Sequence, residues 1–117
     1  MTFEIHHKKD YALVRVKTDR LDTNTAPGLK SELLVLHNKG EKNIVVDMRQ
    51  CTYCDSSGLR AILVGNRLCE DALGAFIISG LQPDVENLIR ISMLHTVLLI
   101  SNSVDDAEGL LEKKEHL

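Results

Sequence analysis

The chain has 117 residues, of which 44% are hydrophobic and 26% are charged, and its formal net charge is -3. This length suits one compact domain over residues 1–117, and the balance of apolar to charged residues excludes a disordered tail. The negative charge and an aromatic content of 3% remove the basic surface and the stacking side chains on which nucleic-acid binding depends. We therefore expect a globular domain that binds neither nucleic acid nor an anionic membrane surface.

We expect neither a signal peptide nor a membrane-spanning segment. Residues 1–10 lack the apolar run of a signal peptide, and no stretch approaches the roughly 20 apolar residues that span a bilayer. The three cysteines are an odd number without a secretory signal, which fits reduced thiols better than a disulfide framework. The expected location is the cytoplasm.

Apolar runs predict strands, and helical spacing of apolar residues predicts helices, in alternation from residue 11 onward. The expected strands are residues 3–5, 11–16, 43–47, 75–78 and 97–100, the first two forming a hairpin or two edge strands. The expected helices are residues 26–39, a segment from Asp55 or Ser56 to about Glu70, a segment starting at Pro83, and a last one capped by Ser103. This order predicts an α/β fold with a mixed, mostly parallel β-sheet of about five strands flanked by about four helices.

Polar residues follow two of the predicted strands. Because the carboxyl ends of parallel strands meet at one edge of a sheet, α/β folds generally place their sites there. Asp22 follows one strand end, and Asp47 and the segment 54–58 follow the next. We therefore expect Asp22 and Asp55 to approach each other despite their separation in sequence.

The start of the second helix carries an acid, two hydroxyls and a glycine, at Asp55, Ser56, Ser57 and Gly58. An N-cap acceptor stabilises a helix by roughly 1 kcal/mol, but capping explains only one of the three polar residues. Glycine in the first turn costs up to about 1 kcal/mol relative to alanine. Its missing side chain suggests that another group approaches the backbone closely there.

A serine at this place could accept a phosphate. Free N–H groups and the positive end of the helix dipole favour an anion by roughly 0.3 to 1 kcal/mol. The added charge of about -1.5 to -2 would lie beside Asp55 and Asp22, and would repel an acidic or closely packed partner. These properties predict a switch that another protein reads.

The run 44–47 followed by residues 53–59 closely resembles the phosphorylation-site segment of STAS domains of the anti-anti-sigma type, also called anti-sigma factor antagonists. The family motif Asp-Ser-Ser-Gly-Leu stands unchanged at residues 55–59. Leu21 with Asp22, and the stretch from Ser79 to Leu94, also look like recurring places of the family, so the similarity spans nearly the whole chain. Departures are mild: Arg60 stands where a small residue is common, and Cys51 and Cys54 replace other apolar residues.

The resemblance implies a non-enzymatic regulator without a cofactor. Ser56, the first serine of the pair, would be phosphorylated by an anti-sigma factor that is also a serine kinase. The unphosphorylated form would bind this anti-sigma factor and free a sigma factor, phosphorylation would break the complex, and a PP2C-type phosphatase would reset the cycle. The implied contact surface consists of Asp22, Asp55, Ser57, Gly58 and Leu59.

Three other interpretations compete with this one. A STAS subunit that docks on the ATPase of a lipid-transport ABC system would share the fold and need no phosphoserine. The Cys51-Thr-Tyr-Cys54 sequence before a helix invites a redox function, in which the helix end lowers a thiol pKa. Asp47 at a strand end is also typical of a two-component receiver domain. However, the chain lacks the acidic pair after the first strand and the lysine after the last strand that a receiver needs.

Neither metal binding nor catalysis has support in the sequence. The five histidines are scattered and form no ligand set at helical or strand spacing. Ser56 has no histidine near it in sequence that could act as a base, so its expected chemistry is to receive a phosphate from another protein's active site.

Overall fold

The structure, a computed structural model, describes residues 2–115, with side chains up to residue 113. The strands are β1 (Phe3–His7), β2 (Ala12–Val16), β3 (Arg20–Leu21), β4 (Ile44–Asp47), β5 (Tyr53–Cys54), β6 (Phe76–Ser79) and β7 (Leu99–Ser101). The helices are α1 (Ala26–Asn38), α2 (Ser56–Asp71), α3 (Pro83–Ile91), the 3-10 turn η1 (Leu94–Thr96) and α4 (Val104–Glu115).

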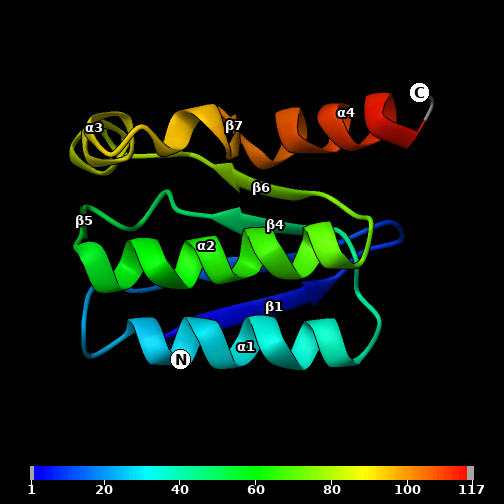
Figure 1. The fold of residues 1–117 in the computed structure, drawn as a ribbon, viewed down its shortest axis with the longest axis horizontal. Coiled ribbons are helices and arrows are strands. Elements are labelled where there is room, and N and C mark those ends of the chain that lie inside the picture. Colours follow the sequence, from blue (N-terminus) through cyan, green and yellow to red (C-terminus); the bar gives the residue numbers. More distant parts are fainter. Residues whose placement is uncertain (1, 116–117) are drawn as a thin grey trace.

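Five of the strands form one sheet in the order β1-β2-β4-β6-β7. β1 pairs with β2 antiparallel, as a hairpin, and the other three pairings are parallel. The carboxyl ends of the parallel strands lie at the left of Figure 1, together with α3 and the start of α2. This architecture confirms the predicted mixed, mostly parallel sheet with four helices.

Both faces of the sheet are covered. Val14, Val46 and Ile78, which are neighbours in register on three adjacent strands, pack into the larger core with α1, α2 and α3. The residues before them, Leu13, Val45 and Ile77, pack against α4 on the other face. Because both faces are buried, these strands are continuously apolar rather than alternating, which is the pattern that identified them in the sequence.

Three short elements differ from the prediction. β3 (Arg20–Leu21) lies where no strand was expected. The segment 50–54, expected as a turn, contains β5, which pairs in parallel with β3 so that Leu21 lies opposite Cys54. The segment 94–96, for which no element was expected, forms η1 after Met93, whose φ of 61° is left-handed. The last strand begins at Leu99 rather than at residue 97, because backbone hydrogen bonds from the N–H groups of Val97 and Leu98 return to Leu94.

None of the helices within residues 2–115 is both long and apolar enough to cross a membrane.

Candidate functional site

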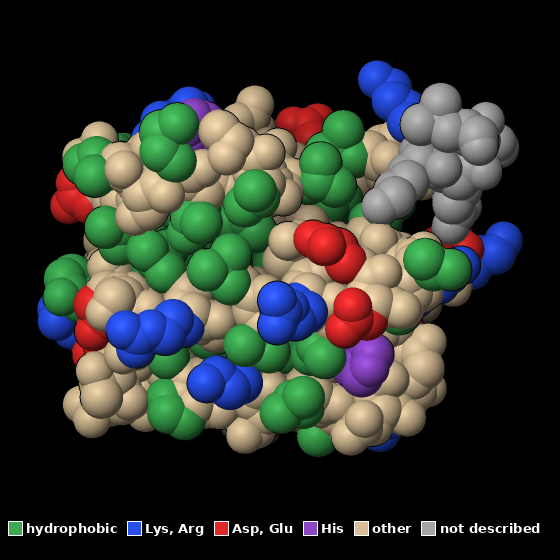
Figure 2. All heavy atoms as spheres, in the orientation of Figure 1, with side chains coloured by type: hydrophobic (Ala, Val, Ile, Leu, Met, Phe, Trp, Pro, Cys, Tyr) green, Lys and Arg blue, Asp and Glu red, His purple; other side chains and the backbone are tan. Residues whose placement is uncertain are grey.

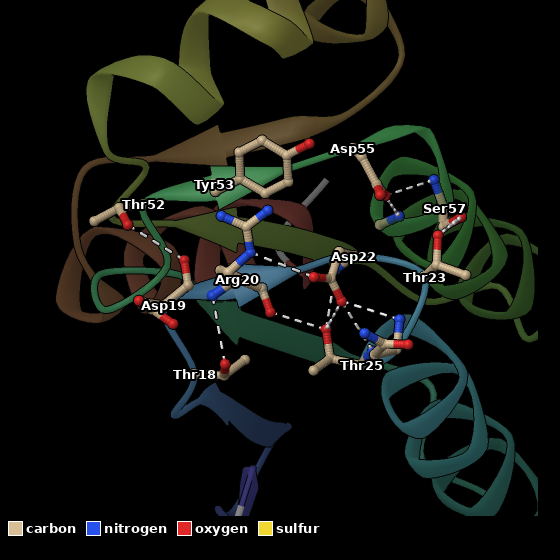
Figure 3. A network of polar contacts seen from close by, with 12 residues as sticks. Thr18, Asp19, Arg20, Asp22, Thr23, Thr25, Thr52, Tyr53, Asp55 and Ser57 are labelled. Atoms are coloured by element: carbon tan, nitrogen blue, oxygen red, sulfur yellow. Dashed lines mark hydrogen bonds and ion pairs between the residues drawn. The ribbon is translucent and has the colours of Figure 1, made fainter.

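The β3–β5 pair positions the predicted site at the carboxyl edge of the sheet. Asp22 directly follows β3 and Asp55 directly follows β5, and the two strands are in register at Leu21 and Cys54. The Asp55 N–H donates to the Leu21 carbonyl oxygen at 3.2 Å. The two acidic residues therefore follow neighbouring strand ends, and Figure 3 shows them on adjacent segments.

Asp55 is the N-cap of α2. Its backbone is extended, and its Oδ1 accepts hydrogen bonds from the N–H groups of Ser57 at 2.9 Å and Gly58 at 3.1 Å. This confirms the capping role but changes the expected environment of a phosphate. Two of the N–H groups that were expected to be free for an anion are already occupied by a carboxylate, so a phosphate on Ser56 would meet negative charge at the helix end.

The two serines of the motif have different surroundings. Ser56 is the first residue of α2 and its side chain is exposed. Ser57 is half-buried, and its Oγ lies 3.4 Å from the Oγ1 of Thr23 in the segment before α1. Ser56 is therefore accessible to another protein, whereas Ser57 joins the start of α2 to the β3–α1 connection (Figure 3).

Asp22 is held by its own segment. Its carboxylate accepts hydrogen bonds from the N–H groups of Asn24 at 3.0 Å and Thr25 at 3.3 Å, and lies 3.4 Å from the Arg20 Nε. Partial burial acts to raise the pKa of Asp22, but these hydrogen bonds outweigh it and the pKa is lowered. The Arg20 guanidinium also stacks 4.0 Å above the centre of the Tyr53 ring, which links β3 to β5.

Gly58 and Leu59, expected on the contact surface, are buried. A Cβ on Gly58 would come within 2.5 Å of both the Leu21 carbonyl oxygen and the Cys54 sulfur. Leu59 is 8% exposed and belongs to the core. β3 and β5 of this chain are therefore the groups that approach the Gly58 backbone closely. The sequence had suggested a contact surface for a partner at this glycine, and that expectation is corrected.

Three residues at this edge were missed by the sequence analysis: Arg20, Thr23 and Tyr53. Arg20 contacts Asp22 and stacks on Tyr53, which links β3 to β5. Thr23 links the β3–α1 connection to Ser57 of α2. Pairing between two strands of two residues leaves no periodic pattern, so no signal in the sequence identified them.

The cysteines do not have the properties of a redox pair. Cys51 and Cys54 are buried thiols, and the Cys51 Sγ donates to the Tyr53 carbonyl oxygen at 3.1 Å. Burial raises the pKa of both thiols, that of Cys54 to about 12, with the neighbouring Cys51 and Asp55 contributing to the latter. The redox interpretation requires a lowered thiol pKa and is not supported.

Asp47 does not have the environment of a receiver's phosphoacceptor. It is 4% exposed, and its Oδ2 accepts from Arg49 Nη2 at 3.1 Å and lies 3.5 Å from Arg15 Nε. The Asp47 carboxylate is therefore paired with two guanidinium groups of this chain. Within the described part of the chain, no three His, Cys, Asp or Glu side chains are grouped so that they could hold a metal ion.

Comparison with known proteins places the chain in a family. The family model described as "STAS domain" matches residues 2–107, and the chain belongs to this family. Over 100 residues it is 27% identical to the Bordetella bronchiseptica protein named "Putative anti-sigma factor antagonist BtrV", with 86% of each chain covered.

Solved structures agree with this fold. An anti-sigma-factor antagonist (STAS) domain protein from Planctomyces limnophilus superposes with a TM-score of 0.86 and 12% identity, covering 94% of this chain and 97% of that one. The Bacillus cell fate determinant SpoIIAA in its phosphorylated form superposes with a TM-score of 0.71 and 16% identity, covering 92% and 98% of the two chains.

Proposed function

We propose that this protein is an anti-sigma factor antagonist, a non-enzymatic cytoplasmic regulator that binds an anti-sigma factor serine kinase when Ser56 is unphosphorylated. Asp22, Asp55 and Ser57 supply side chains to the contact surface around Ser56. Gly58 and Leu59 fit the start of α2 tightly against β3 and β5, and so hold that surface in place.

The observation that carries this proposal is the exposed hydroxyl of Ser56 at the first position of α2, beside a carboxylate that already occupies the helix end. Two comparisons support it. The relative from Bordetella bronchiseptica bears the name of an anti-sigma factor antagonist, and the SpoIIAA structure is of a phosphorylated form.

In the proposed cycle, the kinase transfers the γ-phosphoryl group of ATP to the Ser56 Oγ, with loss of the hydroxyl proton and release of ADP. The serine phosphate carries a charge of about -1.5 to -2. Because the Asp55 carboxylate occupies the Ser57 and Gly58 N–H groups, these two groups do not neutralise the new charge, which lies on an exposed side chain that the partner can contact. Binding weakens, and a PP2C-type phosphatase restores the hydroxyl by hydrolysis.

The test is incubation with candidate anti-sigma kinases of the same genome and ATP, followed by mass spectrometry and a binding assay. We expect one phosphate on Ser56 and a weaker complex afterwards. Ser56→Asp should bind more weakly than the unmodified protein, whereas Ser56→Ala should bind constitutively.

Ser57→Ala is the matched control, because it removes the neighbouring hydroxyl and leaves Ser56 in place. It should still be phosphorylated. Absence of phosphate from Ser56 with every kinase that binds the protein, or equal affinity of the Asp and Ala variants, would contradict the proposal.

A further inference from the structure

A groove runs along the outer side of α2 and begins at Arg60, one helical turn after Ser56. One helical stripe forms its wall, at the spacing i, i+3, i+4 and i+7, with Arg60 and Arg67 at its ends and Leu63 and Val64 between them. Lys30 of α1 and Val97 after η1 also line the hollow, which has a volume of about 570 Å³. The groove thus combines an apolar centre with a basic rim.

The apolar part of this surface is continuous. Figure 2 shows a band of hydrophobic side chains between α2 and the segment that joins α3 to β7, with lysine and arginine side chains along its α2 side. Val97 is 58% exposed, and Leu63 and Val64 are only half-buried. Apolar side chains gathered within a polar rim are typical of a protein-binding surface.

The two arginines of the rim have no carboxylate partner among the described residues. The sequence contains six arginines, and four of them, Arg15, Arg20, Arg49 and Arg90, lie within ion-pair distance of a carboxylate. The other two are Arg60 and Arg67, for which no carboxylate of the described residues lies within 4.0 Å. The one acid in the groove, Glu70, accepts a hydrogen bond from the Asn66 side chain at 2.7 Å.

We propose that this groove binds an acidic amphipathic helix of a partner protein. Two adjacent apolar residues of that helix pack on Leu63, Val64 and Val97, and carboxylates about two turns apart pair with Arg60 and Arg67. The match follows from helix geometry, because seven residues span about 10 Å at a rise of 1.5 Å each. Charge complementarity selects an acidic segment, even though the chain as a whole has a net charge of -3.

Ser56 does not line the groove, and the peptide test uses only unphosphorylated protein, so the two proposals can fail separately. The test is selection of a displayed library of helical peptides against the whole, unphosphorylated protein. We expect enriched peptides with Asp or Glu at positions i and i+7 and apolar residues at i+3 and i+4. The double variant Arg60→Glu with Arg67→Glu should weaken their binding by about tenfold or more, which corresponds to about 1.4 kcal/mol.

The matched control is Lys9→Glu, which reverses an exposed charge in the β1–β2 turn and should leave peptide affinity unchanged. Thermal unfolding of each variant checks that the fold is kept. Failure to enrich any peptide, or equal binding to the double variant, would overturn the proposal. Two other outcomes would also overturn it. Preferential binding to phosphatidylglycerol vesicles that the double variant abolishes would assign the groove to a lipid surface. Self-association that is seen by sedimentation and abolished by the double variant would assign it to a second copy of the chain.

Discussion

Gly58 lies where α2 begins and where β3 and β5 come closest to it. A Cβ there would meet the Leu21 carbonyl oxygen and the Cys54 sulfur at 2.5 Å, and the first of these belongs to backbone that cannot move freely. We therefore expect Gly58→Ala to lower the free energy of unfolding by about 1 to 3 kcal/mol, although alanine is the better helix former. Urea denaturation measures this change.

Gly109 in α4 provides the control, because a Cβ there would meet no heavy atom within 4 Å. Gly109→Ala should stabilise the protein by up to about 1 kcal/mol through helix propensity alone. A Gly58→Ala variant that is as stable as the parent would show that packing against β3 and β5 does not require glycine.

The Cys51 and Cys54 thiols should be unreactive in the folded protein. The thiolate is the reactive form, and burial raises the pKa of both groups, that of Cys54 to about 12. We expect iodoacetamide at pH 8 to modify these cysteines in urea but not in the native state, as measured by mass spectrometry. Rapid modification of either thiol in native protein would contradict the burial that excludes a redox role.

The same two thiols make stability depend on pH in a defined direction. Their pKa values are higher in the folded than in the unfolded chain, so the folded protein binds protons more tightly. The contribution of Cys54 to the free energy of unfolding is complete below the ordinary thiol pKa of 9.0 and falls as the pH rises towards about 12. The raised pKa of Cys51 makes its contribution fall in the same direction. Urea denaturation at pH 8 and pH 10 should show the lower stability at pH 10; an increase would contradict this sign.

At the scale of elements, the long patterned segments could be predicted from sequence and the short ones could not. The buried strands and α2 carry enough apolar residues for their period to be read, and Asp55 is a strong N-cap. β5 depends on tertiary hydrogen bonds, from the Thr52 and Tyr53 N–H groups to the Asp19 carbonyl oxygen, and η1 is a three-residue turn that is too short to show a period. The proposed acceptor Ser56 could therefore be identified from sequence, whereas the contact between Thr23 and Ser57 could not.

The role of Asp55 as a hydrogen-bond acceptor at the start of α2 can be tested separately from the role of its negative charge. Asp55→Ala removes the acceptor for the Ser57 and Gly58 N–H groups and should cost about 1 kcal/mol of the free energy of unfolding. Asp55→Asn keeps a side-chain oxygen and should retain most of that stability. Equal losses in the two variants would indicate that the carboxylate acts through its charge at the helix end rather than as a hydrogen-bond acceptor.

At the scale of the whole molecule, α2 connects the two proposed surfaces. Its first residue, Ser56, carries the hydroxyl that we propose as the phosphate acceptor, and its outer stripe from Arg60 to Arg67 forms the wall of the groove. Its inner face, including Ala61 and Ile62, is buried in the core against the sheet. One rigid helix therefore presents an acidic end and a basic side, which suit partner segments of opposite charge.

Phosphorylation should act on the partner and not on the fold, because the Ser56 side chain is exposed and outside the core. We expect Ser56→Asp to change the free energy of unfolding by less than about 0.5 kcal/mol, as measured by urea denaturation. Its weaker binding to the kinase should then recover partly as salt rises, since exposed charges are screened over about 10 Å at 0.1 M. Ser56→Leu, which adds bulk without charge, is the control whose binding should not recover. A loss of affinity in Ser56→Asp that is independent of salt would show that size, and not charge, controls the complex.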